Sequence, residues 1–390
     1  MILPRLALRN LLGAGLKTWL NVVVLSFSFV VIIWSQGLYK GMGDQARVAQ
    51  TDAEFGGGQY WQEKYDPFDP LTLQDAHAAI PESLQTKIEK GEAAPILISQ
   101  ATIYPEGRLQ TILMKGIDPA QSVVNLPTRF LDQENEDLPV LIGTRMAKNT
   151  GLKIGDTVTV RWRDVQGTFD ARDAKIVQIM KTNVPTVDQA QIWVPLDKLQ
   201  ALTRMENEAS LVILAQDTRE FPQTSGWIHK DMDFLLKDIN TLVKTKKVGG
   251  SIIYIILLAL AMLAIFNTQV LSIFRRRKEM GTLMSLGMTR GKIIQLFTME
   301  GAMHSVLAAV VAAIYGIPLL LSFAKKGWAM PQAMDDYGIA LGEVLFPVYG
   351  TGLVIGTTVL ILLVTTIVSF LPTRKIAKLK PTDALRGKMT

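Results

Sequence analysis

Two long uncharged runs, separated by a short basic stretch, constrain the fold of this chain more than any other feature. Residues 248–274 and 301–324 contain no Asp, Glu, Lys or Arg. A run of 18 or more mostly apolar residues is long enough to cross the roughly 30 Å hydrocarbon core of a bilayer as a helix. The sequence therefore predicts two membrane spans joined by a connector, residues 275–300, which carries six basic side chains.

Two further runs without charged residues, 18–39 and 344–373, predict two more spans. A cleavable signal peptide is the alternative for the first of them. However, its apolar core is longer than that of a signal peptide, and no A-x-A-like cleavage site follows. Residues 1–17 are amphipathic and predict a helix that lies in the membrane interface. The fourth run contains glycines that predict close approach between helices: Gly350, Gly352 and Gly356.

The distribution of charge predicts the orientation of the chain in the membrane. Fifteen Lys and Arg residues lie in three short segments, 1–17, 275–300 and 374–390, which hold only three acidic residues. The positive-inside bias places these segments in the cytosol. Residues 40–247 carry 24 basic and 29 acidic side chains. Since this region lies between the first and second spans, it falls outside the cytosol, and its net acidic charge argues against nucleic acid as a partner.

These patterns predict an α-helical membrane bundle of four transmembrane helices with an inserted extracytoplasmic α/β domain. The predicted order is an interfacial helix at 1–17, a first span at 18–39, the outer domain at 40–247, a second span at 248–274, a cytosolic loop with a short helix at 275–300, a third span at 301–324, an outer loop at 325–343, a fourth span at 344–373 and a cytosolic tail at 374–390.

The outer region is predicted to mix strands and helices. Glycines near its start, at 41, 43 and 56–58, predict a flexible connection. A helix is predicted over 71–90, broken near Pro81, and another over 197–205. Segments rich in β-branched residues predict six strands: 95–104, 109–117, 157–163, 174–180, 190–194 and 210–215.

Residues 227–247 show helical spacing of apolar side chains. Two interpretations stay open for this segment. It is either a stalk helix that continues into the second span and transmits motion, or a boundary helix that packs on the core of its own domain.

The connector between the second and third spans carries an unusual apolar face. Met280, Leu283, Met284, Leu286 and Met288 share one side of a short helix, and three glycines, at 281, 287 and 291, permit bends. Methionine-rich faces adapt well to partners. The connector is therefore either a docking element for a partner or an ordinary basic cytosolic loop.

The sequence argues against chemistry within this chain. It has no G-x-x-x-x-G-K-[ST] phosphate-binding motif and no cysteine, and its three histidines are too scattered for a metal cluster or a catalytic triad. We expect no catalytic residue, bound cofactor or metal. His304 lies near the start of the third span, where either a functional role or a hydrogen bond between helices accounts for it.

Three motifs resemble the FtsX-like permease family of ABC transporters. The central motif reads RRRKEMG at 275–281, LGMTR at 286–290 and FTMEG at 297–301. The ends of the chain, ALRNLL at 7–12 and PTRKIA to PTDALR between 372 and 386, resemble the opening and closing motifs of the family. Residues 142–156 resemble the extracytoplasmic core domain of that family, which is known from macrolide exporters.

The resemblance implies a permease of the mechanotransmission type in a bacterial inner membrane. Such a permease pairs with a second copy or a paralogue, and it couples to separate ATPase subunits, which bind the ATP and Mg²⁺. The resemblance assigns the ATPase contact to the central motif: Glu279, Met280, Gly281, Leu283, Met284, Leu286, Gly287, Met288 and Arg290.

Within the family, the layout favours lipoprotein-releasing permeases, which extract lipid-anchored proteins and pass them to a periplasmic carrier. One departure is that residues 164–172 are too short for the long hairpin that engages the carrier. Acyl chains would then lie in a cleft between the first and second spans: Val22, Leu25, Phe29, Ile33, Ile252, Ile256, Leu260 and Leu263. The alternatives are export of a peptide, drug or lipid by the same mechanism, and a membrane sensor or scaffold, such as a cell-division regulator, that transports nothing.

Overall fold

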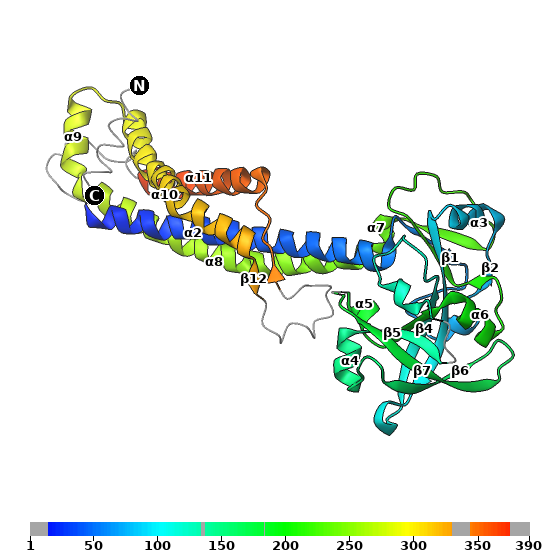
Figure 1. The fold of residues 1–390 in the computed structure, drawn as a ribbon. Coiled ribbons are helices and arrows are strands. Elements are labelled where there is room, and N and C mark those ends of the chain that lie inside the picture. The colour runs from blue at the N-terminus through cyan, green and yellow to red at the C-terminus, as the bar shows by residue number, and fades with distance from the viewer. Residues whose placement is uncertain (1–14, 134–136, 183, 330–343, 375–390) are drawn as a thin grey trace. The chain divides into compact units, whose positions relative to one another are not determined.

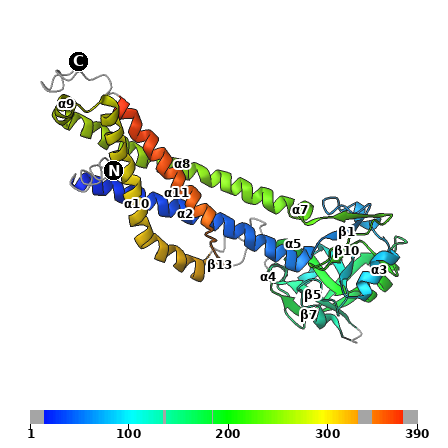
Figure 2. The ribbon, with the colours of Figure 1, turned by 90° about the horizontal axis from the view of Figure 1, so that it is seen from above.

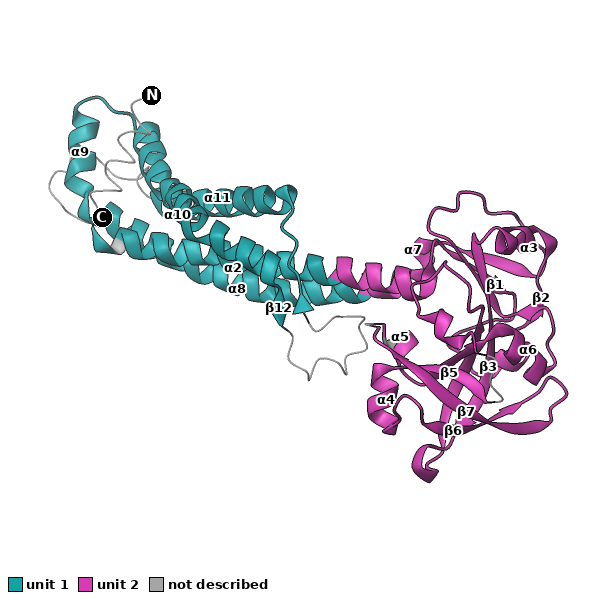
Figure 3. Cartoon of the chain, viewed as in Figure 1, with its two compact units in different colours: residues 1–42, 242–330, 344–390 teal, residues 43–241, 331–343 magenta. Residues whose placement is uncertain are grey.

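The computed structural model describes residues 15–133, 137–182, 184–329 and 344–374. The chain divides into two compact units (Figure 3). One unit is helical and consists of residues 1–42, 242–330 and 344–390. The other contains the sheet and consists of residues 43–241 and 331–343. Each unit is described by itself below.

Four helices of the described chain are long and apolar enough to cross a membrane (Figures 1 and 2). They are α2 (Leu16–Gln50), α8 (Lys237–Arg275), α10 (Arg290–Lys326) and α11 (Thr351–Thr373). A short helix, α9 (Arg277–Ser285), lies between α8 and α10. The number of candidate spans matches the prediction from the sequence. Because helix ends do not mark the bilayer boundaries, the exact spans stay predictions.

Two sequence predictions about the helical unit are wrong. α2 continues through Gly41 instead of bending there. The glycine serves close packing, because a Cβ at this position would overlap the carbonyl of Phe346. Gly352 and Gly356 do not mediate close approach between the helices of this chain, since no atom lies within 4 Å of a Cβ built on either. Tight helix crossings occur instead at other glycines: Gly250, Gly301 and Gly316.

The core of the helical unit forms where all four long helices meet. α2 contributes Val22, Leu25 and Phe29, which are at most 2% exposed. α8 contributes Ala261 and Ile265, both 1% exposed. The opposite faces of these helices carry exposed apolar side chains, as expected for helices that border lipid.

The main sheet of this unit has nine strands within the described residues, in the order β11-β1-β10-β3-β4-β8-β5-β7-β6. The bounds are β1 Gln59–Gln62, β3 Ala93–Ile103, β4 Gln110–Ile117, β5 Leu138–Gly143, β6 Thr157–Arg163, β7 Phe169–Met180, β8 Gln191–Pro195, β10 Leu211–Leu214 and β11 Trp227–Lys230. β4 pairs with β8, and β5 with β7, in parallel; the other pairings are antiparallel.

Part of this sheet closes on itself. β6 pairs with β7 along one edge and with residues 101–103 of β3 along the other. The strands from β3 through β6 therefore form a closed ring. On β6, buried Val158, Val160 and Trp162 alternate with exposed residues, so the apolar side of the strand fills the ring interior.

Short helices surround the strands of this unit. They are α3 Glu82–Glu89, α4 Thr144–Thr150, α5 Pro185–Asp188, α6 Leu196–Thr203 and α7 Met232–Leu235. Residues Thr51–Phe55 form a π-helix, and Thr72–Gln74, Pro105–Gly107 and Thr128–Leu131 are 3₁₀ turns. Two-residue pairings join β2 (Ala78–Ala79) to β9 (Glu208–Ala209) and, in the helical unit, β12 (Trp328–Ala329) to β13 (Val344–Leu345).

All six predicted strands and the helix near 197–205 are present in the structure. Two helix predictions need correction. The segment predicted as a helix over 71–90 is helical only at 72–74 and from Glu82, directly after Pro81. The segment over 227–247 begins as strand β11, and the long helix starts only at Lys237. From there α8 runs without a break to Arg275, so the predicted stalk and the second span form one helix.

A buried ion pair fixes the end of β5. The carboxylate of Asp188, which is 1% exposed, accepts a hydrogen bond from the backbone N–H of Arg145 at 3.0 Å and one from its guanidinium at 3.2 Å. β5 ends at Gly143, where a Cβ would lie 2.5 Å from the Cα of Asp188. The glycine therefore lets the acidic side chain reach the start of α4.

Asp188→Asn is expected to remove one component of the pH dependence of stability. Burial raises the pKa of Asp188 above its ordinary value, although bonds from Arg145 oppose the shift. The carboxyl group of Asp188 binds its proton more tightly in the folded state than in the unfolded state. Its contribution to the stability of the folded state is therefore lost as the pH rises through the folded pKa. Between about pH 4 and pH 7, the melting temperature of the variant relative to wild type should therefore rise. A difference that stays constant over this range in scanning fluorimetry would contradict the prediction.

Candidate coupling site

The chain reverses direction around α9, between the ends of α8 and α10 (Figures 1 and 2). Arg276 interrupts the helix with φ −99° and ψ 21°. Gly287, at φ +92°, ends the turn after α9, with Met288 N–H donating to Leu283 O at 3.0 Å. Thr289 then caps α10 by accepting a hydrogen bond from Lys292 N–H at 3.4 Å. Of the three glycines predicted to permit bends, only Gly287 occupies the left-handed region that favours glycine.

An apolar cluster holds α9 against its neighbouring helices. Met280 is fully buried, and it packs with Ile273 of α8 and with Ile293 and Phe297 of α10. Leu283, Met284 and Met288 lie half-buried around this cluster. Much of the methionine-rich face therefore packs on the chain's own helices.

Arg276 links α9 to α10 by charge. Its guanidinium donates to Glu279 at 2.7 Å and to Glu300 at 2.7 Å. Glu300 is only 5% exposed. The guanidinium also lies 4.8 Å from the ring centre of Phe297. These contacts make the junction of α8, α9 and α10 one connected unit.

The structure divides the predicted ATPase-contact residues into three groups. Met280 and Gly281 are buried within the chain, and the half-buried group is Leu283, Met284 and Met288. The exposed group is Glu279, Leu286, Gly287 and Arg290. Leu286 is 79% exposed, which makes it the most accessible apolar side chain of the segment.

The predicted acyl cleft does not form one surface within this chain. Val22, Leu25, Phe29 and Ile33 are at most 7% exposed, because they point into the helical core. Ile252, Ile256, Leu260 and Leu263 are between 54% and 60% exposed and lie on the uncovered face of α8. The two predicted halves of the cleft therefore lie on different faces.

A polar cluster that the sequence did not reveal lies where α8, α10 and α11 cross. A Cβ at Gly301 of α10 would overlap Ser369 of α11 and lie 2.9 Å from Gln269 Nε2 of α8. His304 lies one turn further along α10 and is 3% exposed. Its Nδ1 bonds to the carbonyl of Glu300 at 3.0 Å, so the hydrogen bond is within one helix and not between helices as predicted. Gly301 is part of the FTMEG motif identified in the sequence. Its role in close helix packing becomes visible only where the helices cross in the structure.

No group of three or more His, Cys, Asp or Glu side chains that could hold a metal ion occurs within the described ranges. The site offers helix packing, an ion-pair link and an exposed apolar tip. It can transmit force between helices.

Comparison with known proteins identifies the class. Residues 251–381 match the family model of the FtsX-like permease C-terminal region, and residues 18–230 match that of the MacB-like periplasmic core domain. These two matches together define a permease of the ABC transporter type. The chain belongs to the FtsX-like permease family with a MacB-like periplasmic core domain.

Three relatives illustrate the range of this family. An uncharacterized ABC transporter permease from Methanocaldococcus jannaschii is 24% identical over 65% of this chain and 64% of its own length. The lipoprotein-releasing system transmembrane protein LolC from Xylella fastidiosa is 21% identical over 75% of this chain and 77% of its own length. The macrolide export ATP-binding/permease protein MacB from Neisseria meningitidis is 25% identical, over 42% of this chain and 23% of its own length.

A solved structure, the extracellular domain of the noncanonic ABC-type transporter YknZ from Gram-positive bacteria, covers 41% of this chain at 14% identity. The match covers 83% of that structure, with a TM-score of 0.27.

Proposed function

We propose that this chain is a permease subunit that couples ATP hydrolysis by a separate ATPase to movements of its extracytoplasmic domain. The observation that carries the proposal is the Arg276 link, which ties α9 to Glu300 of α10 through two charged hydrogen bonds. A protein that pushes on the exposed part of α9 therefore displaces α10 as well. ATP and Mg²⁺ would be held by the ATPase.

The length of α8 supports transmission of that movement. A continuous helix of 39 residues spans about 58 Å at 1.5 Å per residue. A rigid helix transmits displacement from one end to the other better than a chain interrupted by loops. This favours the stalk interpretation of the segment ahead of the second span.

For the substrate, we propose lipoprotein release from the inner membrane, with a second permease copy or paralogue completing the transporter. The similarity to LolC extends over more of this chain than the similarity to MacB. The exposed face of α8 offers apolar surface to an acyl chain, whereas the α2 residues of the predicted cleft would have to separate from the helical core first. Release of a radiolabelled lipoprotein from proteoliposomes to a soluble acceptor tests this substrate.

Two features bear on the other functions known within this family. Asp164 closes the β6–β7 turn tightly by accepting hydrogen bonds from Gln166 N–H and Thr168 N–H, and this leaves little chain for a carrier-binding hairpin. The MacB-like core domain supports export of a peptide, drug or lipid as the second candidate. A membrane sensor or scaffold that transports nothing, such as a cell-division regulator, is the remaining alternative.

Leu286→Asp is expected to reduce co-purification of the ATPase and the permease-stimulated hydrolysis at least tenfold. An exposed leucine at the tip of α9 would be an apolar anchor in the interface, and a buried charge there would oppose docking. The matched control is Leu71→Asp, because Leu71 is 87% exposed in the other unit. If Leu286→Asp and Leu71→Asp both keep the ATPase bound and active, α9 is not the docking element. If no ATPase binds the wild type, the sensor interpretation replaces the transporter.

A further inference from the structure

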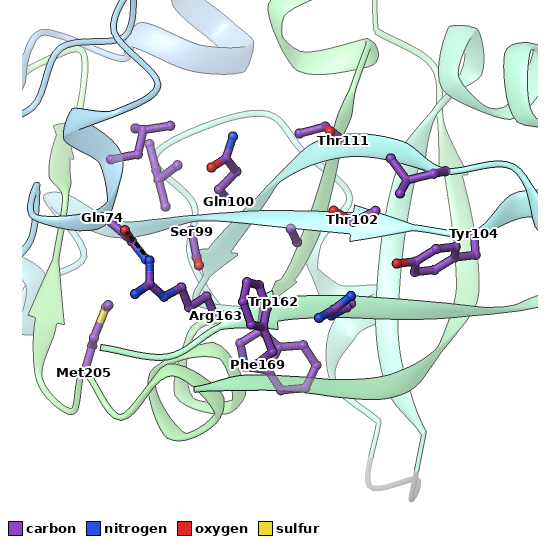
Figure 4. Close-up of a pocket in the computed structure, with 15 residues that line it drawn as sticks. Gln74, Ser99, Gln100, Thr102, Tyr104, Thr111, Trp162, Arg163, Phe169 and Met205 are labelled. Carbon is purple, nitrogen blue, oxygen red and sulfur yellow. Dashed lines mark hydrogen bonds between the residues drawn. The ribbon is translucent and has the colours of Figure 1, made fainter. Parts of the chain in front are cut away.

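A cavity of about 390 Å³ lies in the sheet unit, beside strands β3, β4 and β6. Figure 4 shows Ser99, Gln100, Thr102 and Thr111 along the first two strands, with Trp162 and Phe169 on the other side of the space. Cavities of a few hundred Å³ are the usual size for small-molecule sites. Nothing in the proposed coupling mechanism uses this cavity.

The polar side chains around the cavity have unused hydrogen-bonding capacity. Ser99, Gln100, Thr102, Tyr104 and Thr111 make no side-chain hydrogen bond to any part of the chain that the structure describes. Ser99 is only 7% exposed, so its hydroxyl has little access to solvent water as a hydrogen-bond partner. These groups offer several donors and acceptors to a ligand.

The charge of the cavity is entirely positive. Arg161 and Arg163 line it, and none of the 15 described lining residues is Asp or Glu. Arg163 donates hydrogen bonds to Gly167 O at 3.1 Å and to Gln74 Oε1 at 3.2 Å, the second of which Figure 4 shows. Arg161 lies 4.4 Å from the ring centre of Phe169. Since a guanidinium has five N–H donors, both retain capacity for an anion in a fixed position.

Apolar surface completes the cavity. Trp162 and Ile98, which are at most 2% exposed, form buried walls. Phe169 and Leu109 lie at the rim and are 61% and 68% exposed. A ligand that covered these two side chains would gain from their burial.

We propose that this cavity binds a small amphipathic organic anion, in which an apolar or aromatic body carries one carboxylate or similar acidic group. The anion would bond to Arg161 and Arg163, and the body would pack on Phe169 and Leu109. The source of such a molecule is either a water-soluble organic acid or a fatty acid released from lipid. The proposal goes beyond the coupling function, because it concerns the outer domain alone.

The test uses the full chain in a non-ionic detergent without any ATPase, so its failure leaves the coupling proposal untouched. Three probes share one body and differ in charge: 4-phenylbutyrate, 4-phenylbutanol and 4-phenylbutylamine. In titrations followed by saturation-transfer NMR, the carboxylate is expected to bind with a Kd of about 1 mM, as suits so small a ligand. We expect the neutral and cationic probes to bind at least tenfold more weakly.

The double variant Arg161→Gln with Arg163→Gln is expected to weaken binding of 4-phenylbutyrate at least tenfold. Arg129→Gln, which removes an exposed arginine that does not line the cavity, should leave binding unchanged. Competition with dodecanoate distinguishes the sources: stronger displacement than by unlabelled phenylbutyrate indicates a fatty acid, and equal or weaker displacement indicates a water-soluble organic acid. Equal binding of all three probes, or full binding by the double variant, would overturn the proposal.

Discussion

Arg276→Gln is expected to detach α9 from α10 and to abolish most of the permease-stimulated ATP hydrolysis. The substitution removes two hydrogen bonds of 2.7 Å, one of which neutralises the buried carboxylate of Glu300. Breaking a buried charged pair costs about 3 kcal/mol, at the low end of the usual range because Arg276 is itself partly exposed. This corresponds to about a hundredfold increase in local opening. Hydrogen exchange of the amides in residues 277–285 measures that opening without any partner.

The control for this prediction is Arg275→Gln. Arg275 is the preceding arginine of the same basic motif, but its side chain is exposed. We expect it to keep normal exchange and normal ATPase stimulation. Arg276→Lys should restore only part of the effect, since an ammonium cannot reproduce the planar geometry that reaches two carboxylates. If Arg275→Gln and Arg276→Gln behave alike, then ATPase stimulation depends on the overall positive charge of the motif and not on the specific link from Arg276 to Glu300.

The sequence was sufficient to predict the four long apolar helices and most strands of the main sheet because both signals are local. An uncharged apolar run specifies a membrane helix by itself, and β-branched segments bounded by turn residues specify strands such as β6 and β7. Three strands of the nine-stranded sheet were missed: β1, β5 and β11. β1 has only four residues and begins after three glycines, and β5 contains Pro139.

β11 shows why local pattern fails in places. The segment from Trp227 carries apolar residues at helical spacing, which predicted a helix. However, β1 lies alongside it and pairs Gln59 with Lys230 and Gln62 with Trp227. A partner strand so distant in sequence supplies hydrogen bonds that override the local preference.

The coupling element shows a second limit. An amphipathic helix specifies that its apolar face will be buried, but not against what. In the structure Met280 is covered by Ile293 and Phe297 of the same chain, so the face predicted to contact an ATPase is largely internal. The exposed residues, above all Leu286, were identifiable only once the helices were placed. Whether an ATPase contacts them stays a prediction.

Gly301→Ala is expected to disrupt the packing of α10 on α11 and to lower the melting temperature by about 4–8 °C. The added methyl group would overlap Ser369 Oγ and Cβ and lie 2.9 Å from Gln269 Nε2. Forcing a methyl group into a tightly packed interface costs about 1–3 kcal/mol, which gives a shift of this order. Because Gly301 directly follows Glu300, the separation also moves the partner of Arg276. We therefore expect ATPase stimulation to fall together with stability.

A second substitution distinguishes a steric cause from any other. In the double variant with Ser369→Gly, the opposing Cβ and hydroxyl are removed, so most of the lost stability should return even though Ser369→Gly alone gives no gain. The coupling energy between the two sites, measured by a double-mutant cycle, should exceed about 1 kcal/mol. Gly249→Ala is the matched control, because no atom of the described chain lies within 4 Å of its Cβ, and a helical alanine should be neutral or slightly stabilising there. Additive effects of Gly301→Ala and Ser369→Gly would mean that the close crossing of α10 and α11 does not set the position of the coupling junction.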